Sequence, residues 1–292
     1  MRLITNPGTN LPDAFIDEHH IEMLPQQIVV DDEFHDTRSG MSLDTVDAWV
    51  AGAKVHPYVL GTSAAEFAGH LTRLGEHDPE QIVIMTSRKM IQSHDACVAA
   101  SRTLERHPKW GHLQTRVIDS TTTDIGTGLV TTYAAKAREA GFSLDDVERL
   151  ANEFAAATTV GAVFQDLEYV VKGGSGSFLK AWVANFLGVR PIVGFIDGQL
   201  ESVGKYKAKN DPTEALKTWI LGARGGAGKR VWLGVAHGQT PVEAETLADK
   251  LAGELDVAYR VVLPLTPSIY LHGGKGCLIA AVTDLDALSW TP

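Results

Sequence analysis

The sequence predicts an α/β protein built from two α/β domains, the N-terminal one with a mostly parallel sheet flanked by helices. Short runs rich in β-branched residues alternate with longer stretches that have the apolar spacing of helices, which is typical of sheets covered by helices. A chain of 292 residues is long enough for one large or two ordinary domains. Glycines cluster soon after Ala157, so we expect domains at 1–157 and 158–292.

In the first half, predicted strands and helices follow one another in order. The β-branched runs predict strands at 2–5, 22–30, 81–85 and 114–119. The apolar spacing predicts helices at 42–51, 64–74, 92–104, 125–140 and 143–157. Ser42 is a good N-terminal cap for the first of these helices, and Gly141 is a stop signal between the last two. This alternation is the reason to expect a parallel sheet.

The second half predicts a further sheet with a hairpin. Strands are expected at 158–164, 191–195, 201–206, 230–237, 259–265 and 278–282. Helices are expected at 209–221 and 240–254, with an apolar helix that contains Trp182 and Phe186 before the second strand. Asp197-Gly198 is a hairpin turn signal. The chain has no internal repeat or long linker, so we expect the two halves to pack closely.

Composition and charge exclude several classes of protein. Hydrophobic residues make up 44% of the chain and charged residues 21%, as in folded globular proteins and unlike disordered ones. The net charge is −10, from 26 Lys and Arg against 36 Asp and Glu, and no basic stripe offsets it. Nucleic acid is therefore not an expected partner. Cys97 and Cys277 are too few for a disulfide framework and are expected to be buried thiols in a reducing compartment.

The apolar segments predict a cytoplasmic protein without a membrane span. The N-terminus turns polar after four residues, which is too soon for a signal peptide. The longest apolar runs, such as 160–164 and 278–282, are far shorter than the roughly 20 residues that cross a bilayer.

Several catalytic and metal-binding templates do not fit the sequence. Residues 222–230 have the Gly-rich, Lys-containing look of a phosphate loop, but Ala223 and Arg230 break the template. Residues 173–177 resemble a nucleophile elbow, but Ser177 replaces its closing glycine. None of the eleven histidines has the i, i+4 spacing with an acid between that zinc needs on a helix. We therefore expect no catalytic residue, no cofactor and no metal site.

Four segments occur in an order that indicates a known family. They are LITNPGTNLP at 3–12, VIDS at 117–120 followed by Gly126-Thr127-Gly128, LEYVVKGG at 167–174, and His272-Gly273-Gly274-Lys275-Gly276. With LGVRPIVGFIDG at 187–198 and the basic run at 205–207, the chain resembles the DegV family of fatty-acid-binding proteins over nearly its whole length. The ordered set is specific, whereas any single segment is weak.

The resemblance implies that one long-chain fatty acid lies between the two domains, with its carboxylate at polar groups and its tail in an apolar tunnel. In bacteria that have the pathway, such proteins look like carriers that present the acid to a separate fatty-acid kinase, and they are not enzymes themselves. Burying about 14 methylenes at about 0.8 kcal/mol each favours binding by roughly 11 kcal/mol before ordering costs. A buried carboxylate needs several donors, so the head-group residues decide specificity.

The first head-group segment of the family, Thr-Ser-x-Pro-Ser, corresponds to the region of Thr62 and Ser63, which has no proline. An ungapped alignment puts Val59 at the threonine of the family, whereas a three-residue deletion puts Thr62 there. We expect Thr62, because its hydroxyl can lie at a helix start beside free backbone N–H groups. The alternative is that Thr62 or Ser63 only caps the helix.

The second head-group segment of the family, Ser-Ser-x-Leu-Ser-Gly-Thr-Tyr, corresponds to residues 86–93, where Ser87 and Ser93 are the expected ligand residues. The Ser-Gly turn of the family is missing, and with it a backbone nest for a carboxylate. Gln92, Ser93 or Arg88 would supply replacement donors. In the alternative, Ser93 caps the following helix and Arg88 is solvated.

Gly174 and His272 complete the expected ligand site. The family continues after its glycine pair with arginine, whereas this chain has Ser175, so one positive charge is missing. His272 matches the family histidine that precedes a Gly-Pro-Gly turn and would donate to the carboxylate. The alternative is a core histidine with protein partners. Lysines within 205–209 replace the arginines of a basic strand in the family, which weakens the recognition of phosphate.

Two other functions stay open from the sequence. One is an enzyme that acts on a small anionic ligand in the interdomain cleft through Arg88, Lys172 and His272, although spacing identifies no nucleophile or general base for it. The other is a divergent binding or interaction protein with a different apolar ligand, or with none.

Overall fold

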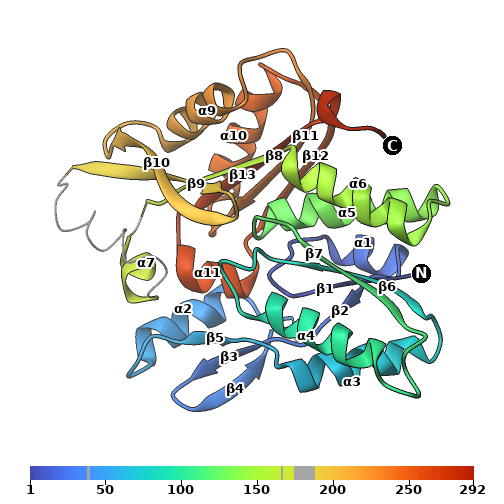
Figure 1. Cartoon of the computed structure of the whole chain (residues 1–292). Helices are drawn as coiled ribbons and strands as arrows, with labels where there is room; N and C mark the ends of the chain where they lie inside the picture. Colours follow the sequence, from blue (N-terminus) through green and yellow to red (C-terminus); the bar gives the residue numbers. More distant parts are fainter. Residues whose placement is uncertain (38–39, 166, 174–187) are drawn as a thin grey trace.

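The computed structural model describes residues 1–37, 40–165, 167–173 and 188–292, and in this part of the chain it is an α/β protein with three sheets (Figure 1). Helices and strands alternate through most of the chain, which confirms the predicted fold class. The predicted helix with Trp182 and Phe186 lies outside the described residues. None of the helices described is long and apolar enough to cross a membrane.

The N-terminal part of the chain forms a four-stranded sheet in which all strands are parallel. In sheet order, the strands are β2 (Glu22–Met23), β1 (Arg2–Thr5), β6 (Glu80–Met85) and β7 (Gln114–Asp119). On one face lie α3 (Ala64–Gly75) and α4 (Ser93–Glu105), and on the other α5 (Ile125–Glu139) and α6 (Leu144–Ala156). The central strands are apolar because helices bury both faces, and the predicted parallel sheet flanked by helices is confirmed.

The predicted single strand at 22–30 is wrong. β2 ends at Met23, and β3 (Gln27–Val30) belongs to a different sheet. Leu24 still donates its N–H to the carbonyl of Thr5 (2.8 Å), but Pro25 follows and has no N–H to give to a ladder. The apolar run therefore crosses from one sheet to another.

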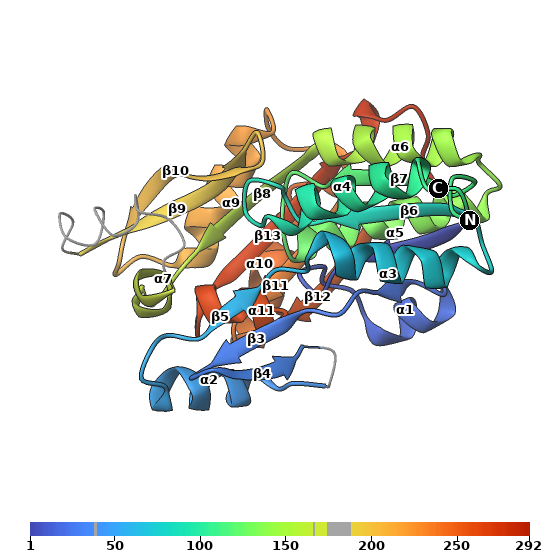
Figure 2. The same ribbon diagram turned by 60° about the horizontal axis from the view of Figure 1, so that its bottom comes forward.

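A small antiparallel sheet lies at the lower edge of Figure 2, apart from the other two sheets. Its order is β4 (Glu33–Asp36), β3, β5 (Tyr58–Leu60), and α2 (Leu43–Gly52) packs beside it. The sequence analysis did not predict β4 or β5, since both are short and β4 is mostly polar. It also did not predict the short helices α1 (Asp13–Glu18), α7 (Glu168–Lys172) and α11 (Pro267–Gly273), the last of which contacts α2.

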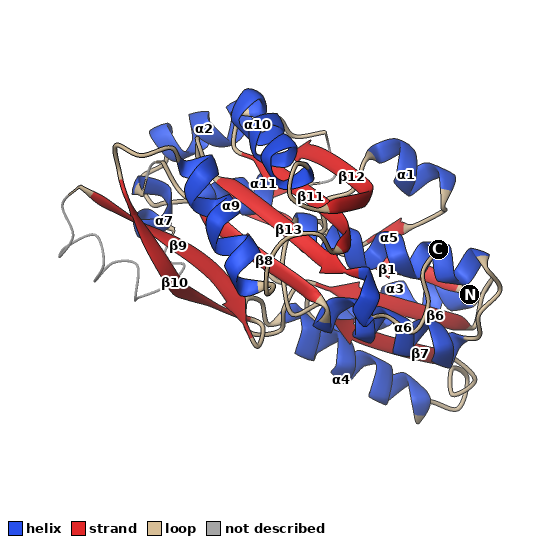
Figure 3. Cartoon of the chain, turned by 90° about the horizontal axis from the view of Figure 1, so that it is seen from above, coloured by secondary structure: helices blue, strands red, loops and turns tan. Residues whose placement is uncertain are grey.

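The C-terminal half contributes a six-stranded sheet in the order β10-β9-β8-β13-β11-β12. Its strands are β8 (Thr158–Val163), β9 (Val189–Ile196), β10 (Gln199–Lys207), β11 (Arg230–His237), β12 (Asp256–Pro264) and β13 (Leu278–Asp284). β11 and β12 are parallel, and the other neighbours are antiparallel. Two helices, α9 (Pro212–Ala223) and α10 (Pro241–Ala252), lie across one face of this sheet (Figure 3).

The predicted hairpin is present between β9 and β10. Asp197 and Gly198 both have positive φ, +49° and +79°, as a two-residue turn that fits the twist of the strands requires. Asp tolerates this backbone better than most residues, and glycine has no penalty there.

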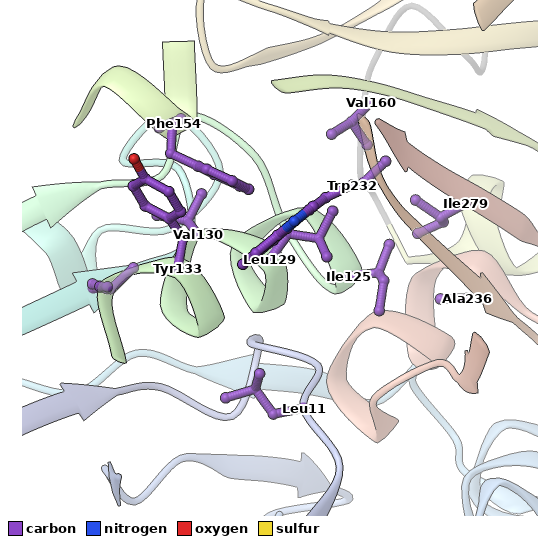
Figure 4. Close-up of a cluster of buried hydrophobic side chains, with 14 of the residues drawn as sticks. Leu11, Ile125, Leu129, Val130, Tyr133, Phe154, Val160, Trp232, Ala236 and Ile279 are labelled. Atoms are coloured by element: carbon purple, nitrogen blue, oxygen red, sulfur yellow. The ribbon is translucent and has the colours of Figure 1, made fainter. Parts of the chain in front are cut away.

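The buried helix α5 lies between the parallel sheet and the six-stranded sheet and joins the two halves. Tyr133 of α5 stacks on Phe154 of α6, with ring centroids 4.4 Å apart, and meets Trp232 of β11 edge-on at 5.9 Å (Figure 4). The same buried cluster reaches Leu11 and Ile279. The halves thus share one core, and the division at residue 157 stays a prediction.

Candidate functional site

Polar residues gather where the parallel strands β1, β6 and β7 end. The segments that follow them begin at Asn6, Thr86 and Ser120, and ligands of such sheets bind at these carboxyl ends. The amide oxygen of Asn6 accepts a hydrogen bond from the N–H of Thr86 (3.3 Å), and the N–H of Ser87 donates to the carbonyl of Thr122 (2.8 Å). The three turns therefore form one connected polar surface.

Asp124 is a fully buried carboxylate next to this surface. It precedes α5 with φ +49° and accepts hydrogen bonds from the N–H of Ile125 (2.9 Å), the amide of Asn10 (2.8 Å), and the N–H and hydroxyl of Thr266 (3.1 Å each). Burial raises the pKa of Asp124 to about 6, although these hydrogen bonds act in the opposite direction. Because Thr266 directly precedes α11, Asp124 fixes the start of that helix.

The glycines of the Gly-Thr-Gly segment permit close packing of α5. A Cβ on Gly128 would lie 2.0 Å from the backbone oxygen of Asn10, and one on Gly126 would lie 2.5 Å from the hydroxyl of Thr122. These two glycines let the helix approach the turns after β1 and β7. In the described structure, their lack of a side chain allows this close contact between α5 and the two turns.

Two adjoining cavities lie beside the turns. The first, of about 250 Å³, is called the polar cavity here, and its walls include Asn6, Gln26, Tyr58, Val59, Thr86 and Ser268. The second, of about 70 Å³, is called the apolar cavity, and its walls include Ala162, Phe164, Val170, Phe195, Leu200 and Ile279. Met90, Thr123, Ile269 and His272 line both cavities. The first cavity thus has polar side chains among apolar ones, whereas the second is almost wholly apolar.

Two wall groups of this site have no hydrogen-bond partner within the described residues. They are the amide oxygen of Gln26 and the hydroxyl of Thr123, both buried. An unpaired buried polar group costs about 1–3 kcal/mol, so such groups normally meet a ligand or water. Thr123 is the more informative of the two, because it stands where the cavities meet.

His272 also stands where the two cavities meet. Burial, and the neighbouring His56, lower the pKa of His272 to about 4, so its imidazole is neutral near pH 7. A Cβ on Gly173 would lie 2.8 Å from Nδ1 of His272 and 3.3 Å from Nε2 of His56. The backbone oxygen of Tyr169 would also lie 3.0 Å from this Cβ, so the first glycine of the pair lets the end of α7 approach the two histidines closely. The second, Gly174, lies outside the described residues.

Three of the predicted residues with hydroxyls lie at the starts of α3 and α4. The hydroxyl of Thr62 donates to the carbonyl of Pro25, and its N–H donates to the hydroxyl of Ser93, both at 3.1 Å. Ser63 accepts from the N–H of Glu66 (3.3 Å) while the carboxylate of Glu66 accepts from the N–H of Ser63 (2.8 Å). Ser63 therefore caps α3, as in the alternative, whereas Ser93 is the first residue of α4 and not its cap.

The remaining predicted residues also have defined places. Val59, the residue that the ungapped alignment pairs with the family threonine, is in the wall of the polar cavity. Ser87 is fully buried; its hydroxyl donates to the carbonyl of Gly198 (2.6 Å) and accepts from the N–H of Lys89 (3.3 Å). Ser87 thus connects the turn after β6 to the β9–β10 hairpin.

The basic side chains considered for an anionic ligand do not form a cationic centre with His272. Arg88 is 60% exposed and lies 3.8 Å from the carboxylate of Asp119. Lys172 is about half exposed and pairs with Glu168 at 2.6 Å. Across the described ranges, no three His, Cys, Asp or Glu residues gather as metal ligands, and Cys97 and Cys277 are buried free thiols.

Comparison with known proteins decides the family. A family model described as "Uncharacterised protein, DegV family" matches residues 1–283. The chain belongs to the DegV family. A DegV domain-containing protein of Streptomyces coelicolor is 26% identical over 285 residues, which cover 97% of this chain and 98% of the relative.

Solved DegV structures share the fold. "Fatty Acid Binding of a DegV family Protein from Thermus thermophilus" has a TM-score of 0.85 at 19% identity, covering 97% of this chain and 99% of that one. The Fatty Acid Kinase (Fak) B3 protein of Streptococcus pneumoniae, loaded with linoleic acid, has a TM-score of 0.81 at 18% identity with the same coverage. The family resemblance seen in the sequence and the expected two-domain α/β fold are confirmed.

Five of the polar cavity residues that were not predicted show which sequence signals were present and which were not. Asn6 and Thr86 carry a signal, because each follows a predicted parallel strand at its carboxyl end. Gln26 and Ser268 have no such sequence signal. Gln26 reaches the cavity because the chain passes from one sheet to another at Pro25, and Ser268 reaches it because α11 packs there. Thr123 precedes the Gly-Thr-Gly segment and could have been considered with it.

Proposed function

We propose that this DegV protein binds one long-chain fatty acid, with the carboxylate in the polar cavity and the acyl chain in the apolar cavity. The observation that carries the proposal is that the two cavities meet at Thr123 and His272. A polar chamber that leads into an apolar one matches an amphipathic acid with a single head group. Walls from both halves of the chain line the site, so the acid would lie between the proposed domains 1–157 and 158–292.

Neutral donors would hold the carboxylate. The hydroxyl of Thr123 is unpaired, Gln26 has an unpaired amide oxygen whose group can turn to present N–H, and His272 is neutral near pH 7. Gly174 stays a proposed contact on the family resemblance. Thr62, Ser63, Ser87 and Ser93 enter the proposal as the frame of the site, because each has a hydrogen bond that fixes a turn or a helix start.

The acyl chain would lie against β8, β9, β10 and β13, whose side chains Ala162, Phe195, Leu200 and Ile279 are apolar. Each buried methylene stabilises the complex by about 0.8 kcal/mol before ordering costs. A cavity of about 70 Å³ holds only part of a long chain, so we expect flexible wall side chains such as Met90 to turn on binding.

Similar proteins support this function and a partner. The Thermus thermophilus protein is described by its fatty acid binding, and the Fatty Acid Kinase (Fak) B3 protein of Streptococcus pneumoniae is described as loaded with linoleic acid. We propose that this chain likewise presents its acid to a fatty-acid kinase, in the cytoplasm, without chemistry of its own. The exposed, paired states of Arg88 and Lys172 give no support to an enzyme of small anions at this site.

Lipid extraction tests the proposal. Protein purified from an expressing bacterium is denatured and extracted with organic solvent, and the extract is analysed by mass spectrometry. We expect about one fatty acid per chain, and we expect palmitic or oleic acid to raise the unfolding temperature of the delipidated protein. The absence of lipid together with no thermal shift would remove the proposal. A different apolar acid in the extract would keep the site and change the ligand.

A further inference from the structure

A carboxylate outside the cavities connects three separate parts of the chain. Asp47 of α2 accepts hydrogen bonds at Oδ1 from the hydroxyls of Tyr169 (2.5 Å) and Tyr270 (2.8 Å), and at Oδ2 from the amide of Gln239 (3.1 Å). Tyr169 is on α7, Tyr270 on α11, and Gln239 in the turn between β11 and α10. Hydrogen bonds from hydroxyls to an ionised carboxylate are short and about twice as strong as neutral ones.

The two tyrosines stand beside the cavity walls. Val170, next to Tyr169, lines the apolar cavity. Ile269, next to Tyr270, lines both cavities, and so does His272, which follows Tyr270 by two residues on α11. The position of α7 therefore affects the apolar cavity and that of α11 affects both cavities, although the tyrosine hydroxyls themselves point to Asp47.

Helix α7 cannot hold its own position. It has five residues, and Leu167 at its N-terminus makes no side-chain capping bond. Isolated helices of this length are unstable in water, so packing and tertiary hydrogen bonds decide where it lies. The Tyr169 ring packs closely on α11, because a Cβ at Gly274 would lie 2.6 Å from it, and the Tyr169 and Tyr270 rings are 5.9 Å apart. Asp47 thus holds α7 and α11 as one unit.

We propose that Asp47 is a positioning residue of the ligand site: by accepting from both tyrosines it holds α7 and α11 closed as walls of the two cavities and slows the release of the bound acid. The release step rests on the proposed fatty-acid binding. The first part of the proposal, that Asp47 holds α7 and α11 in place, does not rest on fatty-acid binding, because the ligand-free protein already makes these contacts.

The experiment compares Asp47→Asn and Tyr169→Phe with Asp44→Asn. Asp44 lies on the same helix and accepts from the same Gln239 (2.8 Å), but it has no bond to either tyrosine in the described structure, which makes it a matched control. Tyr169→Phe keeps the ring and its packing and removes only the hydroxyl, so it remains informative if Asp47→Asn folds poorly.

Amide hydrogen exchange of the ligand-free proteins decides the wall-holding step. We expect the amides of 168–173 and 267–273 to exchange at least about tenfold faster in Asp47→Asn and Tyr169→Phe, with those of β8 and β13 unchanged. Asp44→Asn should stay within about twofold of the wild type. Equal exchange in all four proteins overturns the proposal, whether or not an acid binds.

Release of a bound fluorescent fatty acid, chased with unlabelled acid, decides the second step. We expect release about tenfold faster in the two test variants and within about twofold of wild type in the control. Faster local exchange with unchanged release would also overturn the proposal. If the wild type binds no acid, the proposed function fails while the exchange result still decides the role of Asp47 in the walls.

Discussion

The hydroxyl of Ser87 donates a 2.6 Å hydrogen bond to the backbone carbonyl of Gly198. This bond joins the turn after β6, in the parallel sheet, to the β9–β10 hairpin of the six-stranded sheet. Gly198 has φ +79°, and a Cβ there would lie 2.7 Å from the Ser87 hydroxyl. The contact also fixes the start of the segment that carries Met90, whose N–H donates to the carbonyl of Ser87 (2.9 Å) and whose side chain lines both cavities.

Ser87→Ala should lower the free energy of unfolding by about 1–3 kcal/mol, because it leaves the carbonyl of Gly198 and the N–H of Lys89 without their partner. Denaturant unfolding measures this change. Ser202→Ala, at an exposed position on β10, should stay within about 0.5 kcal/mol of the wild type. Equal stability of the two variants would show that the Ser87 bond does not join the sheets.

Thr123→Val should weaken fatty-acid binding by about five- to tenfold, because it replaces an unpaired hydroxyl at the junction of the cavities by a methyl of the same size. The neighbouring Thr122→Val is the control. Its hydroxyl is also buried and unpaired among the described residues, but it faces Gly126. Competition with a fluorescent acid gives both affinities. Equal loss in the two variants, or none, would place the carboxylate away from Thr123.

Asp124 should make stability depend on pH. Folding raises its pKa from 3.8 to about 6, so the folded protein binds this proton more tightly than the unfolded chain does. The contribution of Asp124 to the free energy of unfolding is therefore largest below pH 4. It falls by about 3 kcal/mol between pH 4 and pH 6, and above pH 6 it no longer changes. Asp124→Asn cannot titrate, so the difference between wild type and variant should fall with rising pH across this window.

Urea unfolding of both proteins between pH 4 and 7 measures that difference. The lowered pKa of His272 acts in the other direction, since stability from a neutral buried histidine is lost as pH falls. That effect is common to the two proteins and cancels in the difference. A difference that does not change with pH would contradict the assignment.

Two helical glycines should respond to alanine with opposite signs. Gly128→Ala should cost at least about 3 kcal/mol of stability, because the new Cβ would lie 2.0 Å from the backbone oxygen of Asn10. Gly69→Ala, at an exposed position of α3 with open space around it, should stabilise by about 0.5–1 kcal/mol through helix propensity. Thermal unfolding measures both. Equal effects would show that α5 does not need close approach at Gly128.

The sequence predicted those strands and helices whose local residue pattern matches their burial in the fold. β1, β7 and β11 have the predicted bounds, because each is a short run with β-branched residues that ends where a polar residue or glycine follows. The single strand predicted at 22–30 is wrong because the apolar residues of this run belong to two sheets. Only Pro25 indicates the break between them. α7 and β5 are too short to show a period, and their positions come from tertiary contacts such as that of Tyr169 with Asp47.

The candidate site was predictable in part for the same reason. His272 follows from the order of family segments and lies at the junction of the two cavities. Thr62 and Ser93 are neighbours, because the N–H of Thr62 donates to the hydroxyl of Ser93, but their hydrogen bonds are to protein groups, which spacing alone does not reveal. Gln26 and Ser268 reach the polar cavity only through the arrangement of the three sheets and α11.

The affinity of the delipidated protein for saturated acids of increasing length tests the central claim most directly. An acyl chain in the apolar cavity should tighten binding by up to about fourfold per added methylene until the cavity is filled. Ala162→Phe, which fills the cavity from β8, should remove this dependence on length. Saturable binding that tightens from octanoate to palmitate in the wild type and not in Ala162→Phe is the predicted result. No saturable binding, or equal affinity for the two acids, would contradict it.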